Sequence, residues 1–233
     1  MTTKHKKEKK TSTLYKLTDS CGKTRNDTQW GPGVSHSGTG EGGLCGPGWI
    51  HAYEHPLIAV LMNPIHSDIK NPRLWEAEGK IAIRDGQLQC GCKTLTTIRE
   101  IPLPEITTKM LVRLVILCAK EVCACRTWNA WADKWLSGED RSAAAAAAAA
   151  KAMWKAAGAV GPAAYDAAAW AAEAAEASAS AAYRAKRAAA RSVQWAAQAA
   201  ASSAYQSTRA AACCGMDLVA IAENACSGLR NFA

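Results

Sequence analysis

The sequence KIAIRDGQLQC, at residues 80–90, decides the fold expected for the first half of the chain. Apolar and polar residues alternate on both sides of Asp85-Gly86, and this alternation is typical of two β-strands, at 80–84 and 87–90. An Asp-Gly pair tolerates the positive φ angles of a type I′ turn. The stretch therefore predicts a β-hairpin that is closed by a two-residue turn.

Further strands are expected on either side of this hairpin. Runs of apolar and β-branched residues predict separate strands at 14–18, 49–53, 74–78 and 95–101. Residues 26–49 are rich in Gly, Asn, Asp, Ser and Thr, so they predict a long loop. A loop of that length inside a compact domain often has a function.

The same half of the chain also predicts helices. Pro56 suits the first turn of a short helix at about 57–62, and Pro64 is expected to end or kink that helix. Apolar residues at spacings of three and four predict a longer helix at 105–123. A second long helix carries three tryptophans on one face, which we interpret as a packing surface: Trp128, Trp131 and Trp135.

Composition divides the chain into four parts. Residues 1–12 form a basic tail that is expected to be disordered. Residues 13–137 predict an α+β domain with a small mixed or antiparallel sheet and two helices. Residues 138–212 form an alanine-rich helical region, and residues 213–233 predict a short C-terminal helix.

Alanine dominates the third part, where it accounts for 38 of the 70 residues 143–212. Because alanine has the highest helix propensity, we expect helices at about 143–157 and 163–212. Polar residues recur along the second of these at spacings of three, four or seven, which places a polar stripe opposite an alanine face. That pattern predicts an all-α bundle or a long helical hairpin, with self-association into a homo-oligomer as the other arrangement.

The charge pattern indicates which classes of partner to expect. The formal net charge is +8, but the basic tail holds no aromatic residue for base stacking, so nucleic-acid binding is not indicated. The ridge of Arg184, Arg187 and Arg191 is a candidate surface for a partner. No run approaches the roughly 18 apolar residues of a membrane span, and no export signal is visible. We therefore expect a cytoplasmic protein that does not bind membranes.

The ten cysteines are expected to be reduced thiols in that compartment. Cys90-Gly91-Cys92 leaves one residue between the thiols, whereas structural zinc sites usually have spacers of about two to four residues. We expect no metal, and Cys45, Cys90 and Cys92 remain the candidates for a zinc site.

Two segments carry a resemblance to a known family. LCGPGWIHAYEHPL at residues 44–57 and NPIH at residues 63–66 resemble a family of phage and prophage proteins of unknown function. Shorter matches at residues 74–76, 95–97 and 135–142 extend the resemblance, and members of that family also tend to end in alanine-rich tails. The resemblance implies no biochemical activity.

A cluster of aromatic and histidine residues is the main candidate for a binding site. It consists of Trp49, His51, Tyr53, His55 and His66. In the alternative interpretation, these histidines cap turns or bond to the backbone beside the glycine-rich loop.

An enzymatic hypothesis uses part of the same cluster. The order of its elements is similar to that of ADP-ribosyltransferase-like folds, a likeness that implies NAD as the cofactor. Tyr53 would then stack on the nicotinamide, and His51 or His55 would bond to the ribose. Glu76 or Glu78 would stabilise the positively charged transition state.

Two functions are therefore expected. The first is a cytosolic, non-enzymatic interaction protein of the phage or prophage type, whose α+β head binds a protein partner and whose alanine helices pack or self-associate. The second is a nucleotide-binding protein, and specifically an ADP-ribosyltransferase-like enzyme that uses NAD.

Overall fold

The computed structural model describes residues 12–156, seven positions between 166 and 175, and residues 216–227. The chain divides into two compact units. The sheet unit comprises residues 1–59, 70–85 and 89–103, and the helical unit comprises residues 60–69, 86–88 and 104–233.

This division differs from the expected α+β domain at 13–137, because the two long helices belong to the helical unit. The physical reason is the part of the chain against which each helix packs. Pro102 and Pro104 follow the last strand, where a proline donates no hydrogen bond to a sheet. The helices beyond them cover their apolar faces with other helices.

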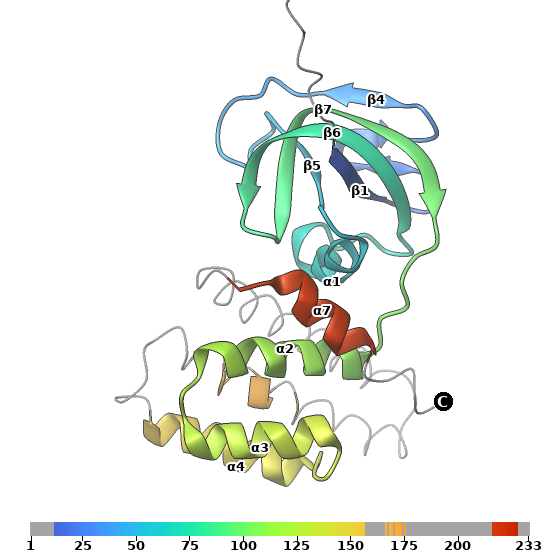
Figure 1. The fold of residues 1–233 in the computed structure, drawn as a ribbon. Helices are drawn as coiled ribbons and strands as arrows, with labels where there is room; N and C mark the ends of the chain where they lie inside the picture. The colour runs from blue at the N-terminus through green and yellow to red at the C-terminus, as the bar shows by residue number, and fades with distance from the viewer. Residues whose placement is uncertain are drawn as a thin grey trace, which may run out of the picture. The chain divides into compact units, whose positions relative to one another are not determined.

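The sheet unit is built on an antiparallel sheet (Figure 1). Its strands are β1 (Ser12–Thr18), β4 (Ser35–Ser37), β5 (Ile50–Ala52), β6 (Arg73–Asp85) and β7 (Gln89–Ile101). The strand order is β1-β6-β7-β4, and β5 also pairs with β7. Two short strands, β2 (Lys23–Thr24) and β3 (Thr28–Gln29), form a separate ribbon.

A single bridge closes the sheet on itself. Tyr15 of β1 and Tyr53, which follows β5, exchange two backbone hydrogen bonds of 2.8 and 2.9 Å. Because β1 also pairs with β6, and β5 with β7, the four strands form a ring. The ring encloses a small core that holds Leu14, Trp30, Ala52, Ala77, Cys90, Cys92 and Leu95.

The predicted hairpin is confirmed, although its turn is not the expected one. Asp85 pairs with Gln89, so the turn spans the three residues 86–88 and is not of type I′. Gly86 alone takes a positive φ, of 51°.

The strands expected separately at 74–78 and 95–101 are parts of β6 and β7, each 13 residues long. Both strands curve strongly in Figure 1. Register shifts between Glu76 and Ala77 and at two points within residues 79–83 allow the curvature, because an irregular ladder bends a strand. A Cβ at Gly79 would lie 3.0 Å from Leu95 Cδ1, so this bend also needs a glycine.

Two further expectations in this region were wrong. Residues 26–49 are not all loop, because β4 pairs with β7 and its serines bond to threonines: Ser37 Oγ lies 2.8 Å from Thr94 Oγ1. The short helix is not ended by Pro64, since α1 (Pro56–His66) continues past it. A proline removes only one helical hydrogen bond, and the Asn63 side chain secures the following turn through both backbone groups of Ile69, at 2.9 and 3.1 Å.

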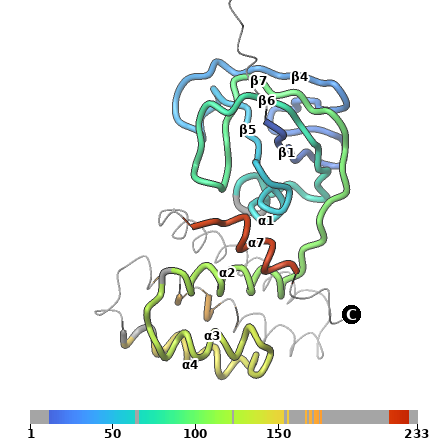
Figure 2. Tube along the Cα trace, viewed as in Figure 1, coloured from blue at the N-terminus to red at the C-terminus, as the bar shows by residue number. Residues whose placement is uncertain are grey.

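The helical unit contains α2 (Thr108–Val122), α3 (Arg126–Ser137), α4 (Ala143–Ala156) and α7 (Leu218–Ser227), whose courses Figure 2 traces. The tryptophans of α3 form a packing surface as predicted, since Trp128, Trp131 and Trp135 are all buried. Trp128 and Trp131 meet edge to face at 5.5 Å. The helix ends at Gly138, whose φ of 88° is the left-handed conformation that glycine adopts at helix ends.

The described parts of the alanine-rich region agree with the predicted polarity. Ala168, Ala171 and Ala175 are buried, whereas Asp166 and Glu173 are exposed. The basic tail at 1–11, the remainder of the predicted helix at 163–212, its bundle or hairpin arrangement, and the ridge of Arg184, Arg187 and Arg191 lie outside the described residues. Within the described part of the chain, no helix combines the length and the apolar character needed to cross a membrane.

The C-terminal helix also forms as expected. Asp217 caps α7, because its Oδ1 accepts hydrogen bonds from the backbone nitrogens of Val219 and Ala220, both at 3.1 Å. Its buried residues include Leu218 and Ala222.

Candidate functional site: a pocket on the sheet unit

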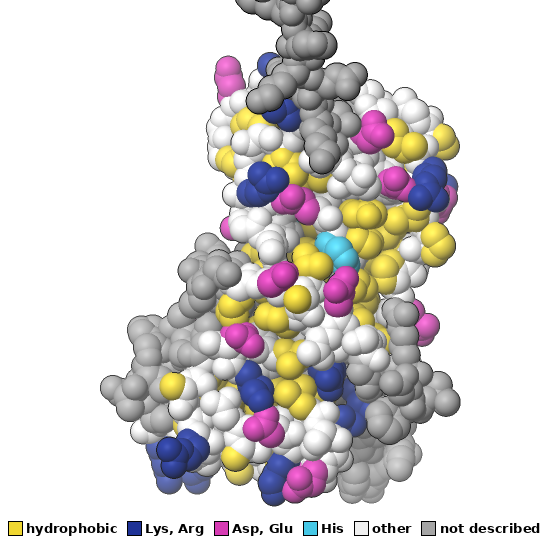
Figure 3. All heavy atoms as spheres, in the orientation of Figure 1, with side chains coloured by type: hydrophobic (Ala, Val, Ile, Leu, Met, Phe, Trp, Pro, Cys, Tyr) yellow, Lys and Arg dark blue, Asp and Glu magenta, His cyan; other side chains and the backbone are white. Residues whose placement is uncertain are grey.

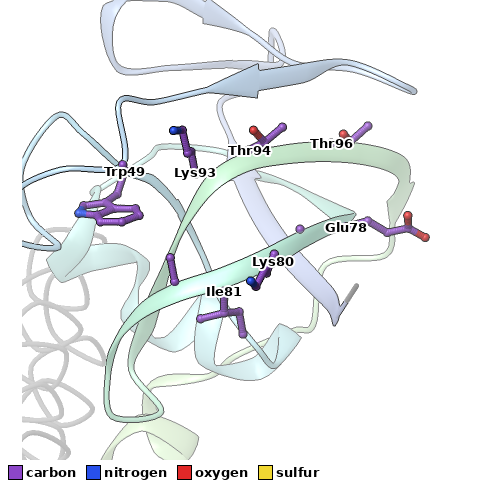
Figure 4. Close-up of a pocket in the computed structure, with 10 residues that line it drawn as sticks. Trp49, Glu78, Lys80, Ile81, Lys93, Thr94 and Thr96 are labelled. Carbon is purple, nitrogen blue, oxygen red and sulfur yellow. The ribbon is translucent and has the colours of Figure 1, made fainter. Parts of the chain in front are cut away.

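A pocket of about 690 Å³ lies on the sheet unit (Figure 4). Its wall residues come from β6, from β7 and from the loop before β5. Figure 4 shows Trp49 at one end and Glu78 at the other, with Lys80, Lys93 and Thr94 between them. We call this site the Trp49 pocket.

The loop that carries Trp49 is folded tightly onto the sheet. Gly40 donates its backbone N–H to Gly48 O at 2.8 Å, and Gly38 donates to Lys93 O at 2.9 Å. The Trp49 indole N–H donates to Gly42 O at 2.9 Å. Trp49 therefore lines the pocket and fastens the loop that forms its rim.

Gly48 is a position where this loop tolerates no side chain. A Cβ there would lie 2.1 Å from Glu41 O, which is a backbone atom that cannot rotate away. We expect Gly48→Ala to displace the loop and to shift the indole N–H resonance of Trp49 in a 1H-15N spectrum. Gly43→Ala is the matched control, because nothing lies within 4 Å of the place that its Cβ would occupy. An unchanged Trp49 resonance in Gly48→Ala would contradict this description of the loop.

The Trp49 pocket carries unpaired charge. Lys80, Lys93 and Glu78 are exposed, and none of them forms an ion pair with another described residue. The pocket thus offers two ammonium groups, one carboxylate, threonine hydroxyls and the face of an indole. Its net charge is positive at the end nearer Trp49.

Two histidines of the predicted cluster, His51 and His55, bond to the backbone. A ring nitrogen of His51 forms a short hydrogen bond with Leu44 O, beside the glycine-rich loop. His55 Nδ1 accepts from the backbone N–H of Leu57 at 3.3 Å, in the first turn of α1. Burial lowers the pKa of His51 below its usual value, so its ring is neutral at pH 7.

Of the residues of the enzymatic hypothesis, Glu78 alone lines the Trp49 pocket. Tyr53 is only 4% exposed, and Glu76 forms an ion pair with Arg99. Glu78 lies in the Trp49 pocket without either of them. Of the binding residues predicted from the sequence, Trp49 lines this pocket, whereas His66 is the last residue of α1.

Sequence reasoning missed a half-buried lysine beside the sheet core. Lys16 donates from Nζ to His51 O at 2.7 Å and lies 5.1 Å above the ring of Trp30. Burial lowers its pKa to about 8. The available signal was strand alternation, since Lys16 is two residues from the fully buried Leu14 and so shares its face.

Two of the zinc candidates belong to the same core. Cys90 and Cys92 are fully buried, and Cys90 Sγ donates to Ala52 O at 3.3 Å. A hydrogen bond between the two side chains, together with burial, raises the pKa of Cys90. Cys45 is exposed on the loop. Among the described residues, no group of three or more metal-ligating side chains is placed to hold a metal ion.

Lys80, Lys93 and Thr96 are among the pocket residues that the sequence did not indicate. They come together only through the register of β6 against β7, in which Glu78 pairs with Thr96. These residues carry the functional inference, since the chain matches no protein-family model, no curated protein and no solved structure.

Proposed function

We propose that the protein is a non-enzymatic interaction protein of the phage or prophage type, acting in the cytoplasm, whose sheet unit binds a protein partner. The Trp49 pocket would hold a short acidic segment of that partner. The observation that supports this most directly is the pair of exposed, unpaired lysines, Lys80 and Lys93, in one pocket with an indole.

The chemistry of the pocket fits a peptide better than a small cofactor. Tryptophan is enriched among the residues that dominate protein interfaces, because its large face buries much apolar area. An apolar side chain of the partner would lie against Trp49 and Ile81, while a neighbouring carboxylate would pair with Lys80 or Lys93. Each ion pair is largely exposed, so its main contribution is to specificity and to the rate of association.

Glu78 gives the bound segment a direction. It lies at the end of the pocket opposite Trp49 (Figure 4), where it would repel a second acidic residue. The expected ligand is therefore acidic near its apolar anchor and neutral or basic at the Glu78 end.

Binding of NAD and binding of nucleic acid both have less support than binding of a peptide. An NAD site that used Tyr53 would need a side chain that is almost completely buried. Basic and acidic side chains are interspersed on the face shown in Figure 3, whereas nucleic-acid binding favours a continuous basic surface.

A displayed peptide library tests the proposal on the full-length protein. We expect selected peptides to combine an aromatic or aliphatic residue with Asp or Glu. Lys80→Glu combined with Lys93→Glu should weaken their binding about tenfold or more, because attraction becomes repulsion at two positions. The expected peptides should also shift the Trp49 indole resonance, which is assigned by its absence in Trp49→Phe.

The matched control is Lys151→Glu together with Lys155→Glu, two exposed lysines on α4. This pair makes the same change in net charge in the other unit, and binding should stay within about twofold of the parent. Peptides that lack acidic residues, or that bind both double variants equally, would overturn the proposal.

A further inference from the structure

We infer that Lys109, Arg113 and Arg141 of the helical unit form a binding site for a phosphate group, either free phosphate or a phosphate monoester. We call these three residues the cationic cluster. It is independent of the Trp49 pocket, since it lies in the other unit and takes a different chemical group.

The three cations are brought together by the helix geometry. Lys109 and Arg113 are four residues apart on α2, so they share one face of that helix. Arg141 follows α3. The carbonyl oxygen of Leu136, at the end of α3, accepts from Arg113 Nη1 at 3.3 Å and from Arg141 Nη2 at 3.4 Å. Sharing one oxygen atom holds the two guanidinium groups side by side.

Both arginines are fixed by further contacts. Arg141 Nε donates to Trp135 O at 2.8 Å, and its guanidinium lies 4.9 Å from the Trp135 ring. Arg113 Nη2 donates to Asn224 Oδ1 of α7 at 3.1 Å. A ligand would meet donors that are already ordered, so little side-chain entropy is lost on binding.

The cationic cluster carries more positive charge than the dipoles of the neighbouring helix ends would balance. The C-terminus of α3 presents about half a negative charge, which one cation would balance. Lys109 lies in the first turn of α2, where the helix dipole disfavours a cation. Within the described chain, none of the three forms an ion pair, and Lys109 forms no hydrogen bond through its side chain.

The electrostatic consequence is mutual repulsion. Burial, followed by the charges of Arg141 and Arg113, lowers the pKa of Lys109. Burial and Arg113 likewise lower the pKa of Arg141. An anion bound between these groups would relieve the repulsion. A phosphate dianion supplies two charges and several acceptor oxygens, and guanidinium groups form paired hydrogen bonds with it.

Titration of the full-length protein with inorganic phosphate tests the site. We expect saturable shifts of the Arg113 and Arg141 Nε–H resonances, and no such shifts with sodium chloride at equal ionic strength. Lys109→Gln should weaken phosphate binding about threefold or more, because one charge leaves the cluster. This variant is chosen because Lys109 makes no hydrogen bond whose loss would unfold the helix.

Lys151→Gln removes the same charge from an exposed position on α4 and should leave phosphate affinity unchanged. A second titration with a phosphoserine peptide distinguishes the two sources of the group. Tighter binding of the peptide indicates a phosphorylated partner, and equal binding indicates free phosphate. Shifts that chloride reproduces, or that Lys109→Gln leaves unchanged, would overturn the inference, whatever the outcome at the Trp49 pocket.

Discussion

Replacing Trp128 by alanine is expected to lower the free energy of unfolding of the helical unit by about 3–5 kcal/mol. The Trp128 side chain is fully buried, meets Trp131 edge to face, and donates from Nε1 to Ala168 O at 2.9 Å. Its removal leaves a cavity that the surrounding helices fill only in part. Urea unfolding followed by the helix signal at 222 nm measures the loss.

Comparing Trp128→Phe with Trp131→Phe separates the contribution of the Trp128 hydrogen bond to stability from the effect of the lost side-chain volume. Trp131 is also buried, but its indole nitrogen has no hydrogen-bond partner among the described residues. Both Trp→Phe changes remove a similar volume, so Trp128→Phe should cost about 1 kcal/mol more than Trp131→Phe. Equal costs would show that the bond to Ala168 contributes nothing.

The second large effect is expected at Lys16, where methionine should stabilise the sheet unit at pH 7. The fall in pKa from 10.5 to about 8 means that folding penalises the charged lysine by about 3 kcal/mol. Methionine removes that penalty and fills a similar volume, but it leaves His51 O without its donor. The net gain in the free energy of unfolding should be about 1–2 kcal/mol.

The sign of the pH dependence follows from the direction of that shift. Below about pH 8, Lys16 is charged in both states, and the full penalty applies. Between about pH 8 and 10.5, the folded protein has lost this proton while the unfolded chain still binds it. The contribution of Lys16 to the free energy of unfolding therefore rises as the pH increases from about 8 to 10.5.

The free energy of unfolding is measured for the parent protein and for Lys16→Met, and the two values are compared at each pH. Cys90 has a raised pKa and acts in the opposite direction at high pH, but it is present in both. The advantage of Lys16→Met should be largest at pH 7 and should shrink towards pH 10. A constant difference from pH 7 to 10 would mean that Lys16 is not desolvated.

Local patterns in the sequence were enough to predict the elements with strong local signals. The Asp85-Gly86 hairpin and the short C-terminal helix depend on residues that are close in the chain. Strand β4, whose sequence is Ser-His-Ser, has no apolar alternation and forms only because β7 lies beside it. The Trp49 pocket could not be predicted for the same reason, since Lys80 and Lys93 meet only through strand register.

Closure of the sheet at Tyr15 and Tyr53 sets the order in which the unit folds. The hairpin of β6 and β7 needs only a three-residue turn, so it can form early. The bridge joins residues that are distant in the chain and supplies only two hydrogen bonds, so we expect it to form last. Because Lys16 Nζ bonds to His51 O of β5, we expect Lys16 to lose its water only at that step and so to slow the final stage of folding rather than the first.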